Sequence, residues 1–309
     1  MADEPEPPML ARIGREAGVP GLFAALARLP ATDLQSLMLH LARAQSRQRS
    51  PADLLRQHAH DRTVAAGPVD ARRVHDVEQQ AFLAAEGFDA RELPPVSPLG
   101  LQTVLGAIDQ MRVLATARGT EVLSDPTTQL ALEAAVARRQ GADEVRLCAV
   151  GRVLRTQPMP AGDHAHFVLF SMVTAGRAGD RRGFESAALR SQAAVHLRLL
   201  AAAAPGRPTV VGISHASAPP EALEQDIAAP LRHEFPTTRV ELRPERVEGA
   251  EYYRGLMVDI GLADRGGTVH SVADGGATDW TARLLSDRKE RMVVTGIGVE
   301  RVIRLAEPG

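Results

Sequence analysis

Lysine is almost missing from this chain of 309 residues: Lys289 is its one lysine, and every other basic side chain apart from histidine is an arginine. A phosphate-loop lysine or a Schiff-base lysine therefore has a single candidate, and no Gly-x-x-x-x-Gly-Lys pattern precedes it. Any phosphate bound by this protein must be held by arginine side chains, backbone N–H groups or a metal ion.

Cysteine, net charge and long apolar runs are scarce as well. The one cysteine, Cys148, excludes an intramolecular disulfide and a zinc site made of several cysteines, and its inward place on a strand predicts a core residue. A formal net charge of −2 argues against broad nucleic-acid binding, which normally requires a basic surface. No apolar run is long enough to cross a membrane, and the acidic, proline-containing N-terminus is unlike a signal peptide, so we expect a cytoplasmic protein.

The first part of the chain predicts a small helical module at residues 1–66. Residues 1–8 resemble a disordered tip, and leucines at helical spacing from Gly21 to about His60 predict three helices. Ser50 and Pro51 mark the start of the last of them. The small residues of segment 64–68 read as a linker, so a second and larger domain is expected over residues 67–309.

Strands dominate the second domain and lie next to their neighbours in the sequence. This order favours an α+β fold, with a mostly antiparallel sheet flanked by helices. The expected helices cover residues 69–86, 125–139, 184–204, 221–235 and 279–285. The expected strands cover residues 88–96 at an edge or interface, then 112–115, 120–123, 144–155, 167–175, 209–214, 239–242, 252–262 and 269–273.

The chain closes on a strand, a glycine-containing turn and the start of a helix, over residues 293–305. Gly296 and Gly298 let the backbone pass close to a bulky group, and Arg301 is available to meet an anion there. By itself, a Gly-x-Gly turn between a strand and a helix is more often a packing solution than a site.

Three segments in this order resemble the three motifs of class II aminoacyl-tRNA synthetases. They are the segment from Gly87 to Pro94, the strand end Leu154–Gln157 with Phe167 after it, and the closing segment Gly296–Arg301. The closest resemblance is to the histidyl-tRNA synthetase core and to its relative, the regulatory subunit of ATP phosphoribosyltransferase, over roughly residues 69–309. The resemblance implies a class II synthetase-like fold and a homodimer that forms through the segment around Pro94.

The resemblance also implies a site for ATP, Mg²⁺ and an amino acid or another small metabolite. Arg155 and Arg301 correspond to the arginines that hold ATP, and Phe167 to the ring that stacks on adenine. Gln157 stands where the family has a glutamate facing the adenine, and Gly296, Gly298 and Glu300 belong to the third motif. The substrate side is expected to include Thr127, Glu248, Tyr252, Tyr253 and Asp279.

The chain departs from the family at residues that contact the substrate in that family. The family's Arg-Pro-Glu-x-Thr reads Asp-Pro-Thr-Thr-Gln at residues 125–129, and its α-phosphate arginine is Glu248 here. A substrate glutamine and an acid in the strand after the second motif are Leu169 and Val173. No anticodon-binding domain follows Leu305, so we do not expect this chain to charge tRNA alone.

Several side chains keep more than one interpretation. Glu248 has three: it binds a substrate ammonium group, it binds a magnesium ion, or it neutralises the phosphate site. The cluster Asp163–His166 has the ligand types of a divalent-metal site, although a flexible loop that contacts substrate is the simpler interpretation. Trp280 is expected to pack against its own short helix.

Three functions remain open on the sequence. The first is an adenylate-forming, ligase-like enzyme that activates a small carboxylate for a carrier other than tRNA, as Arg155 and Arg301 favour. The second is a non-catalytic regulatory subunit that binds a metabolite and a partner enzyme, as Gln157 and Glu248 favour. The third is an assembly or RNA-binding protein that keeps only the fold, which the near-neutral charge disfavours.

Overall fold

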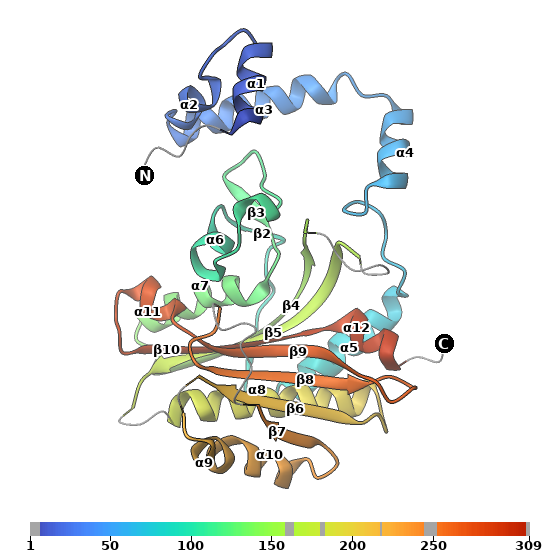
Figure 1. The fold of residues 1–309 in the computed structure, drawn as a ribbon, viewed down its shortest axis with the longest axis vertical. Coiled ribbons are helices and arrows are strands. Elements are labelled where there is room, and N and C mark those ends of the chain that lie inside the picture. Colours follow the sequence, from blue (N-terminus) through green and yellow to red (C-terminus); the bar gives the residue numbers. More distant parts are fainter. Residues whose placement is uncertain (1–6, 158–163, 180–182, 217, 244–251, 307–309) are drawn as a thin grey trace. The chain divides into compact units, whose positions relative to one another are not determined.

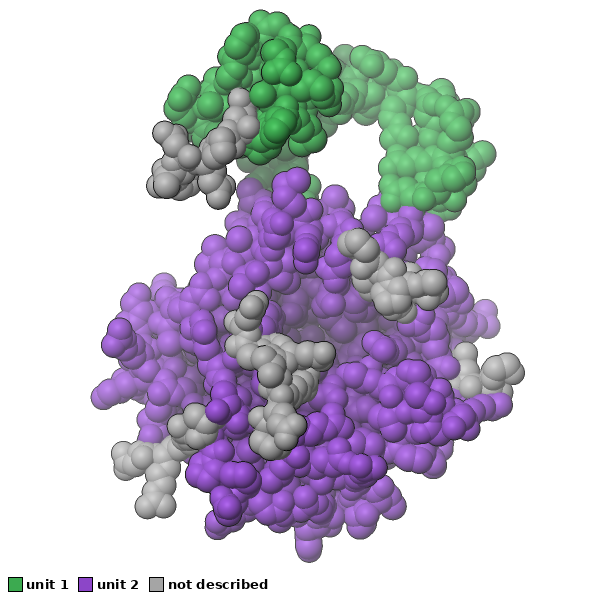
Figure 2. Space-filling model, viewed as in Figure 1, with its two compact units in different colours: residues 1–61, 115–120 green, residues 62–114, 121–309 purple. Residues whose placement is uncertain are grey.

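The computed structural model describes residues 7–157, 164–179, 183–216, 218–243 and 252–306. They form two compact units, one of residues 1–61 with 115–120 and the other of residues 62–114 with 121–309 (Figures 1 and 2). Within the described ranges, no helix is both long and apolar enough to cross a membrane.

The first unit contains four helices, which are α1 (Pro8–Glu16), α2 (Leu22–Ala27), α3 (Ala31–Ser46) and α4 (Pro51–His60). The start of α4 is fixed by a capping box, because Ser50 Oγ accepts from the Asp53 N–H and Asp53 accepts from the Ser50 N–H. Helix α1 was not expected from the sequence. Gly14 is the one buried residue in these four described helices, so they bury almost no core of their own.

The second unit is organised by an eight-stranded sheet, in the order β1-β4-β5-β10-β9-β8-β6-β7. Only the outer pairs β1–β4 and β6–β7 are parallel, which confirms the mostly antiparallel sheet. Its strands are β1 (Asp89–Ala90), β4 (Glu144–Leu154), β5 (His166–Arg177), β6 (Thr209–His215), β7 (Arg239–Leu242), β8 (Leu256–Ala263), β9 (Val269–Thr278) and β10 (Glu290–Gly298).

Helices cover both faces of the sheet, because neighbouring residues of one strand enter different cores. Val293 and Ile297 of β10 pack with α5 (Ala71–Ala84), α8 (Gly183–Ala203) and α12 (Val299–Ala306). Met292 and Val294 pack with α6 (Leu101–Gly106), α7 (Pro126–Arg139) and α11 (Trp280–Leu285). The remaining elements are β2 (Val96–Pro98) with β3 (Thr120–Val122), η1 (Gln110–Arg112), α9 (Pro220–Leu223), η2 (Glu224–Ala228) and α10 (Ala229–Glu234).

Three expected elements are wrong in detail. The strand expected at 112–115 is shortened to a bridge at Ala115, where the Leu114 carbonyl accepts from the Val122 N–H at 2.8 Å. Arg112 belongs instead to the 3₁₀ turn η1, which Asp109 caps by accepting from the Met111 N–H at 2.9 Å. The helix at 221–235 is interrupted by the π turn η2. The strand expected from residue 252 begins at Leu256, because Gly255 adopts a φ of +92° and turns the chain just before it.

Other expectations are confirmed. The segment after Gly87 forms an edge strand, although β1 is only two residues long. The strand pairs β4–β5 and β8–β9 are antiparallel neighbours. Cys148 and Trp280 are each 1% exposed and belong to the core.

Candidate functional site

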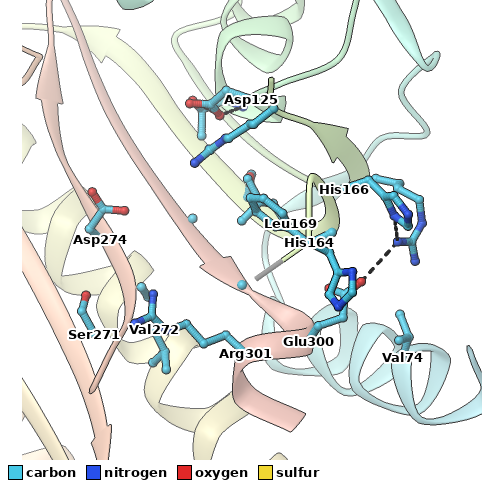
Figure 3. Close-up of a pocket in the computed structure, with 18 of the residues that line it drawn as sticks. Val74, Asp125, His164, His166, Leu169, Ser271, Val272, Asp274, Glu300 and Arg301 are labelled. Atoms are coloured by element: carbon cyan, nitrogen blue, oxygen red, sulfur yellow. Dashed lines mark hydrogen bonds and ion pairs between the residues drawn. The ribbon is translucent and has the colours of Figure 1, made fainter. Parts of the chain in front are cut away.

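A cavity of about 440 Å³ opens on the α7 side of the sheet. Its walls come from segment 67–69, the start of α7, the strands β4, β5, β9 and β10, and the first turns of α12 (Figure 3). This volume lies within the range of about 300–1,000 Å³ that is usual for small-molecule sites.

Arg155 follows the last residue of β4 and is held at the cavity wall by three contacts. Its backbone N–H donates to the Ala165 carbonyl at 2.7 Å, and its Nε donates to the Ser124 carbonyl at 3.2 Å. Its guanidinium carbon lies 5.2 Å from the centre of the Phe167 ring, a cation–π distance. Within the described residues, no carboxylate forms an ion pair with Arg155.

Arg301 enters the same cavity from the first turn of α12 (Figure 3). The side chain is exposed, and it makes no hydrogen bond or ion pair with any residue of the described ranges. Arg155 and Arg301 are thus far apart in the sequence, line one cavity and have no ion-pair partner in the described part of the chain. An anionic group of a ligand suits this arrangement.

Glycines leave the sheet floor of the cavity open. Gly296 of β10 lies in register between Ser171 of β5 and Asp274 of β9. A Cβ atom at Gly296 would meet only Ser171 Oγ at 3.5 Å and the Phe170 carbonyl at 3.9 Å, so the space above the strand is free. Gly275 differs, because a Cβ there would lie 2.3 Å from the Val294 carbonyl. Gly296 therefore shapes the cavity, whereas Gly275 is required by sheet packing.

Two tyrosines at the turn before β8 meet two carboxylates of the cavity. The Tyr252 hydroxyl donates to Asp125 Oδ2 at 2.9 Å, and the Tyr253 hydroxyl donates to Asp274 Oδ2 at 3.1 Å. Burial and the nearby Asp125 charge raise the pKa of Tyr252 well above its usual value, which keeps the hydroxyl protonated as a donor. Asp125 also caps α7, with Oδ1 accepting from the Thr127 N–H and hydroxyl.

Both carboxylate oxygens of Glu300 accept hydrogen bonds from other residues of the protein. One oxygen accepts from Arg152 Nη1 at 3.2 Å, and the other accepts from the Val168 N–H at 2.7 Å (Figure 3). The carboxylate therefore ties the start of α12 to β4 and β5. This arrangement fixes the backbone from which Arg301 projects.

The structure brings together most of the residues that the sequence singled out. Those that line the cavity are Thr127, Arg155, Phe167, Tyr252, Tyr253, Gly296, Gly298, Glu300 and Arg301. Gln157 and Asp279 are not among its lining residues: the Gln157 carbonyl accepts from Arg62 at 2.7 Å, and Asp279 binds Arg254 at 3.0 Å. Glu248 lies outside the described residues.

Sequence reasoning gave no place in the site to Arg152 and Asp274, which line the cavity, and it named Asp125 and His166 only within the segments 125–129 and Asp163–His166. Asp125 carried the local signal of a helix start in Asp-Pro-Thr, and His166 that of its cluster, whereas Arg152 and Asp274 carried none. Among the residues that the structure describes, no group of three His, Cys, Asp or Glu side chains is arranged to hold a metal ion. Asp163 of the Asp163–His166 cluster lies outside the described residues.

Comparison with known proteins shows the fold. No family model and no curated protein matches the chain. An ATP phosphoribosyltransferase regulatory subunit/histidyl-tRNA synthetase from Bacillus halodurans C is similar with a TM-score of 0.60 at 12% identity, over 79% of this chain and 82% of that one. Apo histidyl-tRNA synthetase from S. aureus is similar with a TM-score of 0.59 at 13% identity, over 79% of this chain and 72% of that one.

These similarities confirm the fold expected from the three motif-like segments. The chain has an α+β, class II synthetase-like fold whose sheet is mostly antiparallel. At such low identity they establish architecture only, and function must be argued from the cavity.

Proposed function

We propose that this chain binds ATP together with a small carboxylate in the cavity and activates the carboxylate as an adenylate. In this reaction a carboxylate oxygen attacks the α-phosphorus of ATP, a bond to the AMP moiety forms, and pyrophosphate leaves. The single observation that carries the proposal is the convergence of Arg155 and Arg301, neither of them ion-paired with a described residue, on one cavity.

Adenylate formation depends on positioning and on charge stabilisation, which the cavity can supply. Two arginines that face the reacting phosphate offset the negative charge that develops there. The Phe167 ring beside Arg155 offers a surface on which an adenine base stacks. The open floor at Gly296 leaves room for the ligand next to them.

Magnesium has no evident site among the described residues, which contain no three-ligand group. The arginines of this chain therefore stabilise the phosphate charge in this proposal.

Pyrophosphate exchange tests the catalytic proposal. Purified protein with ATP, Mg²⁺ and each amino acid in turn should incorporate labelled pyrophosphate into ATP with at least one amino acid. Arg155→Ala should remove the exchange, whereas Arg28→Ala, an exposed arginine of the first unit, should not. Exchange absent for every amino acid, together with no thermal shift from ATP, would remove the proposal.

A second candidate is a regulatory subunit that binds a metabolite and a partner enzyme without catalysis. It is favoured by Leu169, an apolar residue that lines the cavity where the family resemblance implies a substrate glutamine. The similar protein from Bacillus halodurans is described as an ATP phosphoribosyltransferase regulatory subunit/histidyl-tRNA synthetase. A thermal shift by ATP or an amino acid without any pyrophosphate exchange would select this candidate over the enzyme.

A homodimer through the segment around Pro94 belongs to either proposal. Light scattering during gel filtration should give twice the mass of one chain, and a Pro94→Glu variant should weaken the dimer. A monomeric mass for the wild type would reject the dimer.

A further inference from the structure

The linker strap, which we define as residues 62–69, forms one wall of the cavity. It joins α4 to α5, and Gly67, Pro68 and Val69 are among the lining residues. Within the described chain, no backbone N–H from Ala66 to Val69 donates to another backbone group. Regular secondary structure therefore does not hold the linker strap in place.

Two side-chain hydrogen bonds join the linker strap to the β4–β5 hairpin. Arg62 Nη2 donates to the Gln157 carbonyl at 2.7 Å, just beyond β4. Nε2 of His166, the first residue of β5, lies 2.7 Å from the Ala65 carbonyl. A Cβ atom built on Gly67 would lie 3.5 Å from His166 Cε1, so the linker strap packs directly on the imidazole ring.

The partners of His166 define its hydrogen-bonding roles. The Ala65 carbonyl can only accept, so Nε2 carries the hydrogen and donates. The Arg152 guanidinium can only donate, so Nδ1, at 3.2 Å from Arg152 Nη1, accepts. Arg152 also donates to Glu300, the residue before Arg301, as the dashed lines of Figure 3 show. A chain of hydrogen bonds thus runs from the linker strap to the helix that carries Arg301.

We propose that the linker strap is a movable wall of the cavity, latched by His166 and Arg62, and that ligand occupancy and latching favour each other. This inference rests on the proposed ATP-sized ligand in the same cavity. A ligand anion held by Arg301 favours the start of α12 in its present place, and Glu300, Arg152 and His166 connect that start to the linker strap. His166 and Arg62 are positioning residues, since they act on the ligand through the wall that they hold.

A spin label on the linker strap tests the latch without any ligand. Ala66 is exposed and Cys148 is 1% exposed, so Ala66→Cys gives a single accessible thiol for a nitroxide. In the His166→Phe background, which keeps a ring but no hydrogen bonds, the label should become several-fold more mobile. In the His166→Gln background, which can still donate and accept, mobility should stay near that of the wild type. Equal mobility in the Phe and wild-type backgrounds would overturn the latch.

Arg62→Ala tests the coupling to the ligand, because Arg62 does not line the cavity. ATP should bind this variant about tenfold more weakly, as expected for the loss of a charged hydrogen bond, mainly through faster dissociation. ATP should also reduce the mobility of the Ala66→Cys label in the otherwise wild-type protein. Unchanged ATP affinity in Arg62→Ala would overturn the coupling, whereas no ATP binding to the wild type would reject the proposed function and leave the latch to the spin-label result.

Discussion

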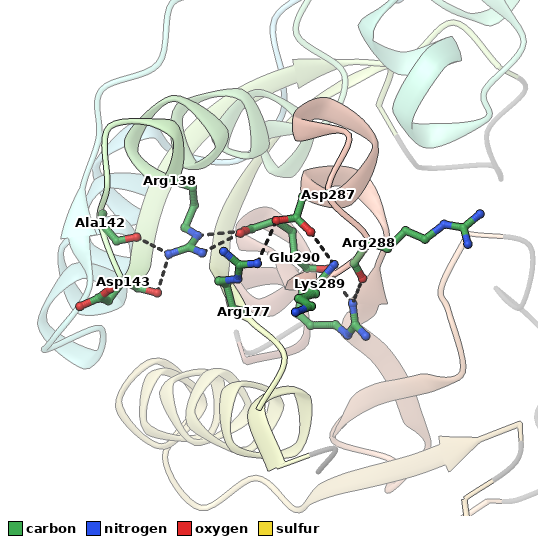
Figure 4. Close-up of polar contacts among 9 residues, drawn as sticks. Arg138, Ala142, Asp143, Arg177, Asp287, Arg288, Lys289 and Glu290 are labelled. Atoms are coloured by element: carbon green, nitrogen blue, oxygen red, sulfur yellow. Dashed lines mark hydrogen bonds and ion pairs between the residues drawn. The ribbon is translucent and has the colours of Figure 1, made fainter. Parts of the chain in front are cut away.

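Arg138 of the second unit has a carboxylate partner, whereas Arg155 and Arg301 of the same unit have none among the described residues. Arg138, near the end of α7, donates to both carboxylate oxygens of Glu290 at 2.9 and 2.7 Å and to the carbonyls of Ala142 and Asp143 (Figure 4). The two side chains are 6% and 5% exposed, and the hydrogen bond to Glu290 is the main cause that raises the pKa of Arg138. The charge of Arg138 is thus paired with a carboxylate, and its guanidinium also donates to two backbone carbonyls.

Arg155 and Arg301 differ on each of these points. One is partly buried and the other exposed, and neither forms an ion pair with a described residue, although Asp125 and Glu300 line the same cavity. Glu300 instead bonds Arg152. Arg138 thus has a carboxylate partner that joins α7 to β10, whereas Arg155 and Arg301 have none among the described residues, although Arg152, which lines the same cavity, is paired with Glu300. Arg138 therefore stabilises the fold, and ligand binding by Arg155 and Arg301 is what we propose.

The largest expected effect breaks the buried pair. Glu290→Ala leaves the Arg138 charge buried without its partner, which should lower the free energy of unfolding by about 3–5 kcal/mol in urea titrations. The matched control is Glu234→Ala, whose exposed pair with Arg198 should contribute less than about 1 kcal/mol. Equal losses for the two variants would contradict the distinction between buried and exposed pairs.

Substitutions at two glycines of adjacent strands should separate the contribution of sheet packing to stability from that of the cavity to ATP binding. Gly275→Ala places a methyl group against the Val294 carbonyl and should cost about 2–3 kcal/mol of unfolding free energy. Gly296→Val points into the cavity, so it should leave stability within about 1 kcal/mol and abolish ATP binding. Calorimetric titration with ATP and urea unfolding measure both. A Gly296→Val protein that binds ATP normally would show that the floor was assigned to the wrong place.

His196, in the core on the α8 side of the sheet, provides a smaller and pH-dependent effect. Burial lowers the pKa of His196 to about 3, and its Nε2 lies 2.9 Å from Thr295 Oγ1. The unfolded chain, with an ordinary pKa of about 6.5, binds this proton first, so stability is full above that pH and falls toward pH 3 by about 1.4 kcal/mol per unit. The pH dependence of urea unfolding should be less steep for His196→Leu. Identical pH dependences would contradict a neutral buried imidazole.

The sequence predicted the parts of this fold that depend on neighbouring strands. The alternating pattern of β4 and β5 and the short loop of β8 and β9 are local, so their pairing followed from the residues alone. Arg155 at the end of β4, and Gly296, Gly298 and Arg301 around the end of β10, were also predicted, because they correspond to motifs of the family that the chain resembles.

The contacts that the sequence missed join residues far apart along the chain. Tyr252 and Asp125 are 127 positions apart, and Ala65 and His166 are 101 apart, so no local pattern could pair them. The role of Glu300 was missed for the same reason, because its partner Val168 N–H lies 132 positions away. Hydrogen bonds of this kind depend on the tertiary arrangement of the strands, which the local sequence does not contain.

A double-mutant cycle on Arg155 and Arg301, read by calorimetric titration with ATP, tests the central claim most directly. If both guanidinium groups hold one ligand anion, each Ala variant should weaken ATP binding by about tenfold to a hundredfold, and the double variant by less than the product of the two losses. The unfolding free energy should fall by less than for Glu290→Ala, because neither arginine forms an ion pair with a described residue and Arg155 loses only its hydrogen bond to Ser124 and its contact with Phe167. Unchanged affinity in either single variant, or losses that multiply as if the sites were independent, would contradict the account.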